Sequence, residues 1–166
     1  TYRAMQDLYK EGKIKAIGVS NFYPDRLVDL ALFNEVKPAV NQIEINPFHQ
    51  QLDAQTYNQK YNVQLQAWAP FAEGRNGMFE NQDLKTIGEK YNKSVAQVIL
   101  RWLLQRGIVP LAKTVNKERM LQNIDIFNFE LNEDDMKKIA SLDKKESSFF
   151  NHQEASAVEM LASLVR

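Results

Sequence analysis

The sequence contains no cysteine, and this absence removes several kinds of chemistry at once. Disulfide bonds, thiol catalysis and cysteine-based metal sites are excluded, and the composition fits a cytoplasmic protein. Long apolar runs are also missing. No run approaches the roughly 20 residues that a membrane-spanning helix needs, and the polar start TYRAMQDLYKEGK is unlike a signal peptide. We therefore expect one soluble globular unit in these 166 residues.

An excess of charge of one sign is lacking as well. Lys plus Arg and Asp plus Glu each number 21, so no overall field would attract nucleic acid or an anionic membrane. We expect neither as a partner. Linkers, low-complexity tracts and short repeats are not evident either, which favours a single folded body.

Strand-like and helix-like segments alternate along the chain. An opening helix ends near Gly12, after which strand and helix follow each other four times. Strands are expected at residues 14–20, 38–46, 63–71 and 108–113, and helices at 24–33, 51–62, 82–91, 94–107, after 116 and at 132–142, with a Gly-containing loop at 72–81. This alternation is typical of a parallel sheet with helical crossovers, either doubly wound or a (β/α)8 barrel.

Two of the expected strands carry a polar face. Gln42 and Glu44 share one face of the second strand, and Gln64, Gln66 and Trp68 share one face of the third. Polar groups on an inner strand are costly unless they are paired, so this pattern indicates a barrel interior or the floor of a site. The alternative explanation for this polar face is an edge strand with one solvent-exposed face.

Three basic residues surround the expected start of a helix in VPLAKTVNKERMLQN, residues 109–123. Lys113, Lys117 and Arg119 lie where the helix dipole is positive and repels cations. Free N–H groups at a helix start, together with an Arg side chain, form a binding site for an anion such as phosphate. Ordinary solvated surface charges are the alternative.

Four ordered motifs resemble the aldo-keto reductase family, specifically the C-terminal half of its barrel. They are IGVSNF (17–22), NQIEINPFHQ (41–50), QAWAPF (66–71) and KTVNKERMLQN (113–123). Residues 129–143 resemble the closing helix of the family, and the chain is similar to its bacterial 2,5-diketo-gluconate reductase-like members. The resemblance implies a (β/α)8 TIM barrel, represented here by four parallel strand–helix units plus C-terminal helices. It also implies reduction of aldehydes and ketones with NADPH and without a metal.

The resemblance implies a specific anion for the basic segment 109–123. In the family, the segment after the last barrel strand holds the adenosine 2′-phosphate of NADPH. Matched residue by residue, Lys113, Thr114 and Arg119 would contact that phosphate, and Gln122 and Asn123 would lie near the adenine.

The resemblance also implies a place for the nicotinamide. Ser20, Asn21 and Gln42 would hydrogen-bond its carboxamide, and Trp68 would stack on its ring. Amide and hydroxyl groups suit this task because a carboxamide both donates and accepts. Without the resemblance, Asn21 is equally well a turn residue, Gln42 a satisfied core amide, and Trp68 a core side chain.

The catalytic groups of the family are expected upstream of Thr1. They are a Tyr that acts as general acid, a Lys, an Asp and a His. Neither His49 nor His152 offers a substitute, so we assign no catalytic residue and expect this chain alone to be inactive. It would then be a shortened form of an NADPH-dependent carbonyl reductase. A non-catalytic NADP(H)-binding module and an interaction protein are the alternatives.

Assembly follows from the number of strands. We expect residues 1–143 to form the half-barrel and residues 144–166 a C-terminal tail. Four strands cannot close a barrel, so both outer strands would keep an unpaired edge. A homodimer or a complementary fragment with the N-terminal half would cover these edges and supply partners for Gln42, Glu44 and Gln66. A small carbonyl substrate would bind only in such a completed barrel.

Overall fold

Among residues 1–164, four parallel strands form one sheet, in the spatial order in which they occur along the chain. They are β1 (Gly18–Ser20), β2 (Val40–Glu44), β3 (Gln64–Trp68) and β4 (Val109–Pro110). The computed structural model describes residues 1–164. Each strand is parallel to its neighbour, so the predicted α/β class with a parallel sheet is confirmed.

Each strand is four residues shorter than the sequence predicts. Residues 13 and 14 remain tied to the end of the first helix, because the Lys13 and Ile14 backbone N–H groups donate to Leu8 O at 3.0 and 3.4 Å. At the other edge, Pro110 has no N–H to donate to the ladder, although Leu111 N–H still reaches Ala67 O at 3.0 Å. The edge strands therefore keep only three and two residues, whereas the inner strands keep five each.

Eight α-helices connect and flank the strands. They are α1 (Tyr2–Lys10), α2 (Pro24–Leu32), α3 (Leu52–Lys60), α4 (Gln82–Tyr91), α5 (Val95–Gln105), α6 (Lys117–Ile124), α7 (Glu133–Ala140) and α8 (Ala155–Ser163). Ser94 and Gln97 form a capping box at the start of α5, where the sequence predicts a helix to begin. The predicted Gly-containing loop is instead a kinked 3-10 segment, η1 (Ala72–Glu80), which left-handed residues such as Gly74 and Gly77 interrupt.

The core lies between the sheet and helix α5. Val98, Ile99, Trp102 and Leu103 are at most 1% exposed and belong to the same buried cluster as the residues of β2 and β3 that face the helices. The α4–α5 turn depends on Gly88, because a Cβ there would lie 2.5 Å from the backbone oxygen of Lys93. The turn brings α4 onto α5 and so completes this layer.

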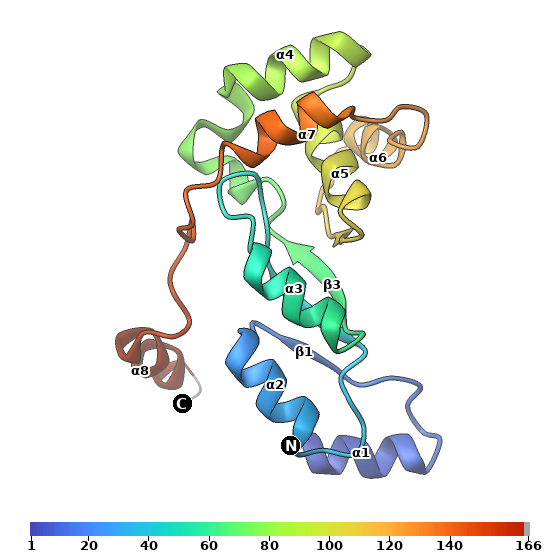
Figure 1. Cartoon of the computed structure of the whole chain (residues 1–166), viewed down its shortest axis with the longest axis vertical. Helices are drawn as coiled ribbons and strands as arrows, with labels where there is room; N and C mark the ends of the chain where they lie inside the picture. Colours follow the sequence, from blue (N-terminus) through green and yellow to red (C-terminus); the bar gives the residue numbers. More distant parts are fainter. Residues whose placement is uncertain (165–166) are drawn as a thin grey trace.

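The segment after α7 runs away from that helix and ends in α8, which the sequence did not predict (Figure 1). Its anchor is Glu44 on β2, which is only 4% exposed. The Ser147 hydroxyl and the Ser148 backbone N–H donate to its two carboxylate oxygens, at 2.5 and 3.0 Å. The expectation that Glu44 would need partners from outside this chain is therefore wrong. Residues 165 and 166 of the expected tail lie outside the described residues.

Candidate functional site

A row of polar side chains crosses the sheet on the face away from the core. Ser20, Gln42 and Gln66 are paired in register on β1, β2 and β3. The Ser20 hydroxyl donates to Gln42 O at 2.9 Å, and Gln42 Nε2 donates to Gln66 Oε1 at 3.2 Å. Since β2 and β3 are inner strands, the alternative of an edge strand with one wet face is wrong. Gln42 and Gln66 are thus hydrogen-bonded to each other within this chain.

Asn21 follows directly after β1 and is held there by its backbone. Its φ of 55° lies in the left-handed region, which asparagine tolerates better than most residues. Its N–H donates to Gln42 O at 2.9 Å. The next residue, Phe22, is fixed by the fully buried Asn41, whose Nδ2 donates to Phe22 O at 2.7 Å. The sequence motif thus folds into a rigid turn at the carboxyl end of β1.

Trp68 ends β3 and closes the group. Its indole N–H donates to Asn21 Oδ1 at 2.8 Å. The structure therefore brings together all four residues expected at the nicotinamide: Ser20, Asn21, Gln42 and Trp68. They lie at or near the carboxyl ends of neighbouring parallel strands, where barrel enzymes build their sites.

The C-terminal segment covers part of this group. Phe149 packs on Trp68 with ring centroids 5.1 Å apart and an angle of 55° between the rings. The guanidinium of Arg75, from η1, lies 4.3 Å from the centre of the Phe149 ring, and its NH1 donates to Ser148 O at 3.0 Å. Sequence reasoning missed Arg75 and Phe149. The only available signal was the pair of phenylalanines beside His152.

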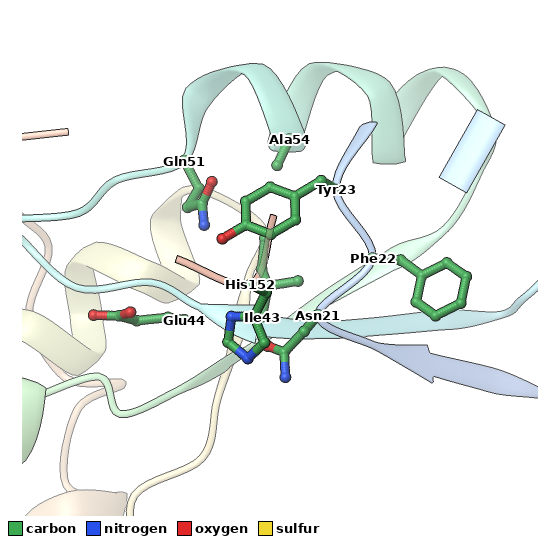
Figure 2. A pocket seen from close by; sticks show the side chains of 8 residues that line it. All are labelled: Asn21, Phe22, Tyr23, Ile43, Glu44, Gln51, Ala54 and His152. Carbon is green, nitrogen blue, oxygen red and sulfur yellow. The ribbon is translucent and has the colours of Figure 1, made fainter. Parts of the chain in front are cut away.

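A small cavity lies beside Asn21 and His152 (Figure 2). With a volume of about 10 Å³ it has room for about one water molecule. Its lining comprises Asn21, Phe22, Tyr23, Ile43, Glu44, Gln51, Ala54 and His152. A second hollow of about 480 Å³ shares four of these residues and extends between α2 and the C-terminal segment. It offers space for a ligand next to Asn21.

Two ionisable groups at the cavity have shifted pKa values. Burial lowers the pKa of His152, and the carboxylate of Glu44 partly opposes this shift. Burial also raises the pKa of Tyr23. The ring of His152 lies 6.4 Å from that of Tyr23 and 6.4 Å from that of Trp68. His152 therefore borders the site as a predominantly neutral imidazole near pH 7.

The basic segment forms a second, more exposed region after β4. Helix α6 is capped by Asn116, whose side chain accepts from Arg119 N–H, while Thr114 Oγ1 accepts from Asn116 N–H. The side chains of Lys113 and Arg119 are exposed, and no residue within 1–164 forms an ion pair with either. Gln122 and Asn123 follow on α6.

A Tyr, a Lys and an Asp do meet in this chain, but away from the strand ends. Tyr91 OH and Lys90 Nζ both contact Asp135 Oδ2, at 2.5 and 2.9 Å. Burial works to raise the pKa of Asp135, but the hydrogen bonds from Tyr91 and Lys90 outweigh it and lower that pKa. Asp135 also belongs to the capping box of α7, so this cluster fastens α7 to α4 (Figure 1). It has a structural role.

No three His, Asp or Glu side chains of residues 1–164 are grouped as a metal ion would require. Within that range, none of the helices has the length and apolar character to cross a bilayer.

Comparison with known proteins gives one consistent result. The model of the aldo/keto reductase family matches residues 1–144. Glyoxal reductase of Bacillus subtilis is 48% identical over 146 residues, which are 88% of this chain and 52% of that protein. Methylglyoxal reductase DkgA of Escherichia coli is 37% identical over 143 residues, 86% of this chain and 52% of that protein. The chain thus spans about half the length of these relatives.

Solved structures agree with the sequence relatives. An aldo-keto reductase from a deep-sea metagenome library superposes with a TM-score of 0.87 and 37% identity, over 93% of this chain and 57% of that one. A Bombyx mori aldo-keto reductase in complex with NADP gives a TM-score of 0.85 and 32% identity, over 91% and 52%. The four strand–helix units are therefore part of the barrel fold of these enzymes, and the chain belongs to the aldo/keto reductase family.

Proposed function

We propose that this chain binds NADP(H), with the nicotinamide at the strand ends and the adenosine 2′-phosphate at the start of α6. The observation that carries this proposal is the arrangement of donors and acceptors around Asn21. Its Oδ1 is occupied by the Trp68 indole, which leaves Nδ2 as the donor. The Ser20 hydroxyl proton is directed to Gln42 O, so its oxygen remains an acceptor. A donor beside an acceptor is complementary to a carboxamide.

The phosphate side rests on charge. Lys113 and Arg119 are exposed cations near a helix start, where free N–H groups also favour an anion. Arg can hold a phosphate with two parallel hydrogen bonds. We propose that Lys113, Thr114 and Arg119 bind the 2′-phosphate, and that Gln122 and Asn123 lie near the adenine. Solved aldo-keto reductases in complex with NADP or NADPH support the choice of cofactor.

We further propose that the chain forms the cofactor side of a carbonyl reductase. Bound NADPH supplies a hydride. The residues of this chain orient its nicotinamide through Asn21 and Trp68 and keep water from part of the site through Phe149. The general acid that protonates the alkoxide would come from outside these residues, because the Tyr91 cluster has a structural role. The same observation is what favours the second candidate, a non-catalytic NADP(H)-binding module.

Calorimetric titration tests the binding proposal in parts. NADPH should bind more tightly than NADH, and 2′,5′-ADP more tightly than 5′-AMP, since only the first of each pair carries the 2′-phosphate. NADPH should in turn bind more tightly than 2′,5′-ADP because of the nicotinamide. Equal affinities within the phosphate pairs would exclude the site at Lys113 and Arg119. Equal affinities for NADPH and 2′,5′-ADP would exclude the site at Asn21.

We also propose that the open edges of the sheet are covered by further strands, either from a second copy or from a fragment with the other half of the barrel. Strands β1 and β4 each have one neighbour among residues 1–164. Next to β4, the side chains of Met120, Ile124 and Phe127 are 50–70% exposed and line an apolar hollow of about 380 Å³. Sedimentation of the chain, alone and with the complementary fragment, tests this. A well-folded monomer that ignores the fragment would contradict it.

A further inference from the structure

The hydrogen bond between Trp68 and Asn21 joins strands that are not neighbours. Trp68 ends β3 and Asn21 follows β1, with β2 between them. The indole Nε1–H can only donate, so it fixes the partner atom, at 2.8 Å, as the oxygen of the Asn21 amide. The contact therefore decides which end of that amide faces the indole and which end is free.

The backbone around Asn21 is already held. Its backbone N–H donates to Gln42 O at 2.9 Å, and the carbonyl of the next residue, Phe22, accepts from the buried Asn41 at 2.7 Å. With the backbone fixed, the remaining freedom of Asn21 is rotation of its side chain. The indole removes that freedom.

The indole is itself restrained by packing. Phe149 lies 5.1 Å from it, and Arg75 lies 4.3 Å from Phe149. Arg75 also donates to the backbone at Ser148, so the C-terminal segment and η1 support the tryptophan together. Because these contacts hold the indole ring in one orientation, its N–H keeps pointing toward the Asn21 amide oxygen.

We propose that Trp68 is a positioning residue for Asn21, in addition to any stacking. It holds the amide so that Nδ2 faces the ligand and donates to the carboxamide oxygen of the nicotinamide. This inference rests on the proposed function. A phenylalanine at position 68 could stack on a nicotinamide, but it has no N–H and would leave the amide free to turn.

A double-mutant cycle separates positioning from stacking. Trp68→Phe should weaken NADPH in the wild-type background by about two- to tenfold more than in the Asn21→Gly background, as expected for one hydrogen bond. Glycine is the suitable replacement because residue 21 has a φ of 55°. Binding of 2′,5′-ADP, which has no nicotinamide, should stay unchanged in all four proteins. An equal loss of NADPH affinity in both backgrounds would show that Trp68 only stacks.

A measurement without ligand keeps the inference separate from the proposed function. If wild-type chain binds neither NADPH nor 2′,5′-ADP, the proposed function fails, and NMR of the indole N–H groups still decides the positioning. The Trp68 N–H should exchange faster with solvent in Asn21→Gly and stay protected in Asn21→Asp, which keeps an oxygen acceptor. Trp102, buried in the core, is the internal control. An unchanged Trp68 signal in Asn21→Gly would overturn the proposal.

Discussion

The two ends of the proposed cofactor site are built in opposite ways. At the strand ends, Asn21, Gln42 and Trp68 are half-buried and already hydrogen-bonded to each other. After β4, Lys113 and Arg119 are exposed and have no ion-pair partner within residues 1–164. The first region is shaped before a ligand arrives, whereas the second contributes charge on flexible side chains. Substitutions should therefore affect stability at the first and affinity alone at the second.

The largest expected effect is on the rate of carbonyl reduction, because neither region contains a general acid positioned to protonate the substrate. The chain by itself should oxidise NADPH with a small aldehyde about 10²- to 10⁴-fold more slowly than a barrel that has its general acid. Loss of NADPH absorbance measures the rate. Tyr91→Phe is the control and should leave any residual rate unchanged. A robust rate that Tyr91→Phe abolishes would instead identify the α4–α7 cluster as the acid.

At the exposed region, Arg119→Ala should weaken NADPH by about ten- to a hundredfold, the loss expected for one charge-assisted contact. NADH affinity and thermal stability should barely change, since the side chain is exposed and forms no ion pair with residues 1–164. Calorimetry with both cofactors measures this. Lys117→Ala removes a charge from the same helix start and should have a much smaller effect. A similar loss of NADPH affinity in both variants would indicate that the positive charge of the whole helix start attracts the phosphate, without a direct contact from Arg119.

At the strand ends, Glu44→Gln should cost stability. Glutamine keeps the shape of the side chain but removes the negative charge to which Ser147, Ser148 and Asn46 all donate hydrogen bonds. The free energy of unfolding should fall by roughly 1 kcal/mol. For a chain of this size that lowers Tm by about 2–4 °C. Glu35→Gln is the matched control, because Glu35 is 77% exposed and its ion pair with Lys10 contributes little. Equal shifts in both variants would contradict the anchoring role of Glu44.

The smallest effect is a dependence on pH. Because burial holds the pKa of His152 below its ordinary value of 6.5, the undocked C-terminal segment binds more protons than the docked one in the range just below pH 6.5. Docking should therefore weaken as the pH falls through that range and stay constant above it. Tryptophan fluorescence reports the change through Trp68. His152→Gln should abolish the dependence, and its persistence would assign the dependence to another group.

Much of this arrangement could be predicted from the sequence, and the remainder has a common physical cause. Periodicity located the inner strands, and the capping box located α5, because these signals are local. The motif residues after β1 and β3 were expected to meet, and the structure brings them together. The anchoring of Glu44 and the packing of Phe149 on Trp68 could not be foreseen. The Glu44 contacts join residues 103 and 104 positions apart, Phe149 also lies far from Trp68 in the sequence, and no local pattern encodes such pairings.

That separation also orders the folding of the chain. The bond between Glu44 and Ser147 spans 103 residues, so its partners stay apart until the intervening strands and helices have collapsed. The C-terminal segment should then dock last and detach first, as a cooperative unit of lower stability than the α5 core. Its departure would expose Trp68 before any strand separates. The proposed nicotinamide site would therefore assemble in the final step of folding. On heating, it would be lost before the rest of the structure unfolds.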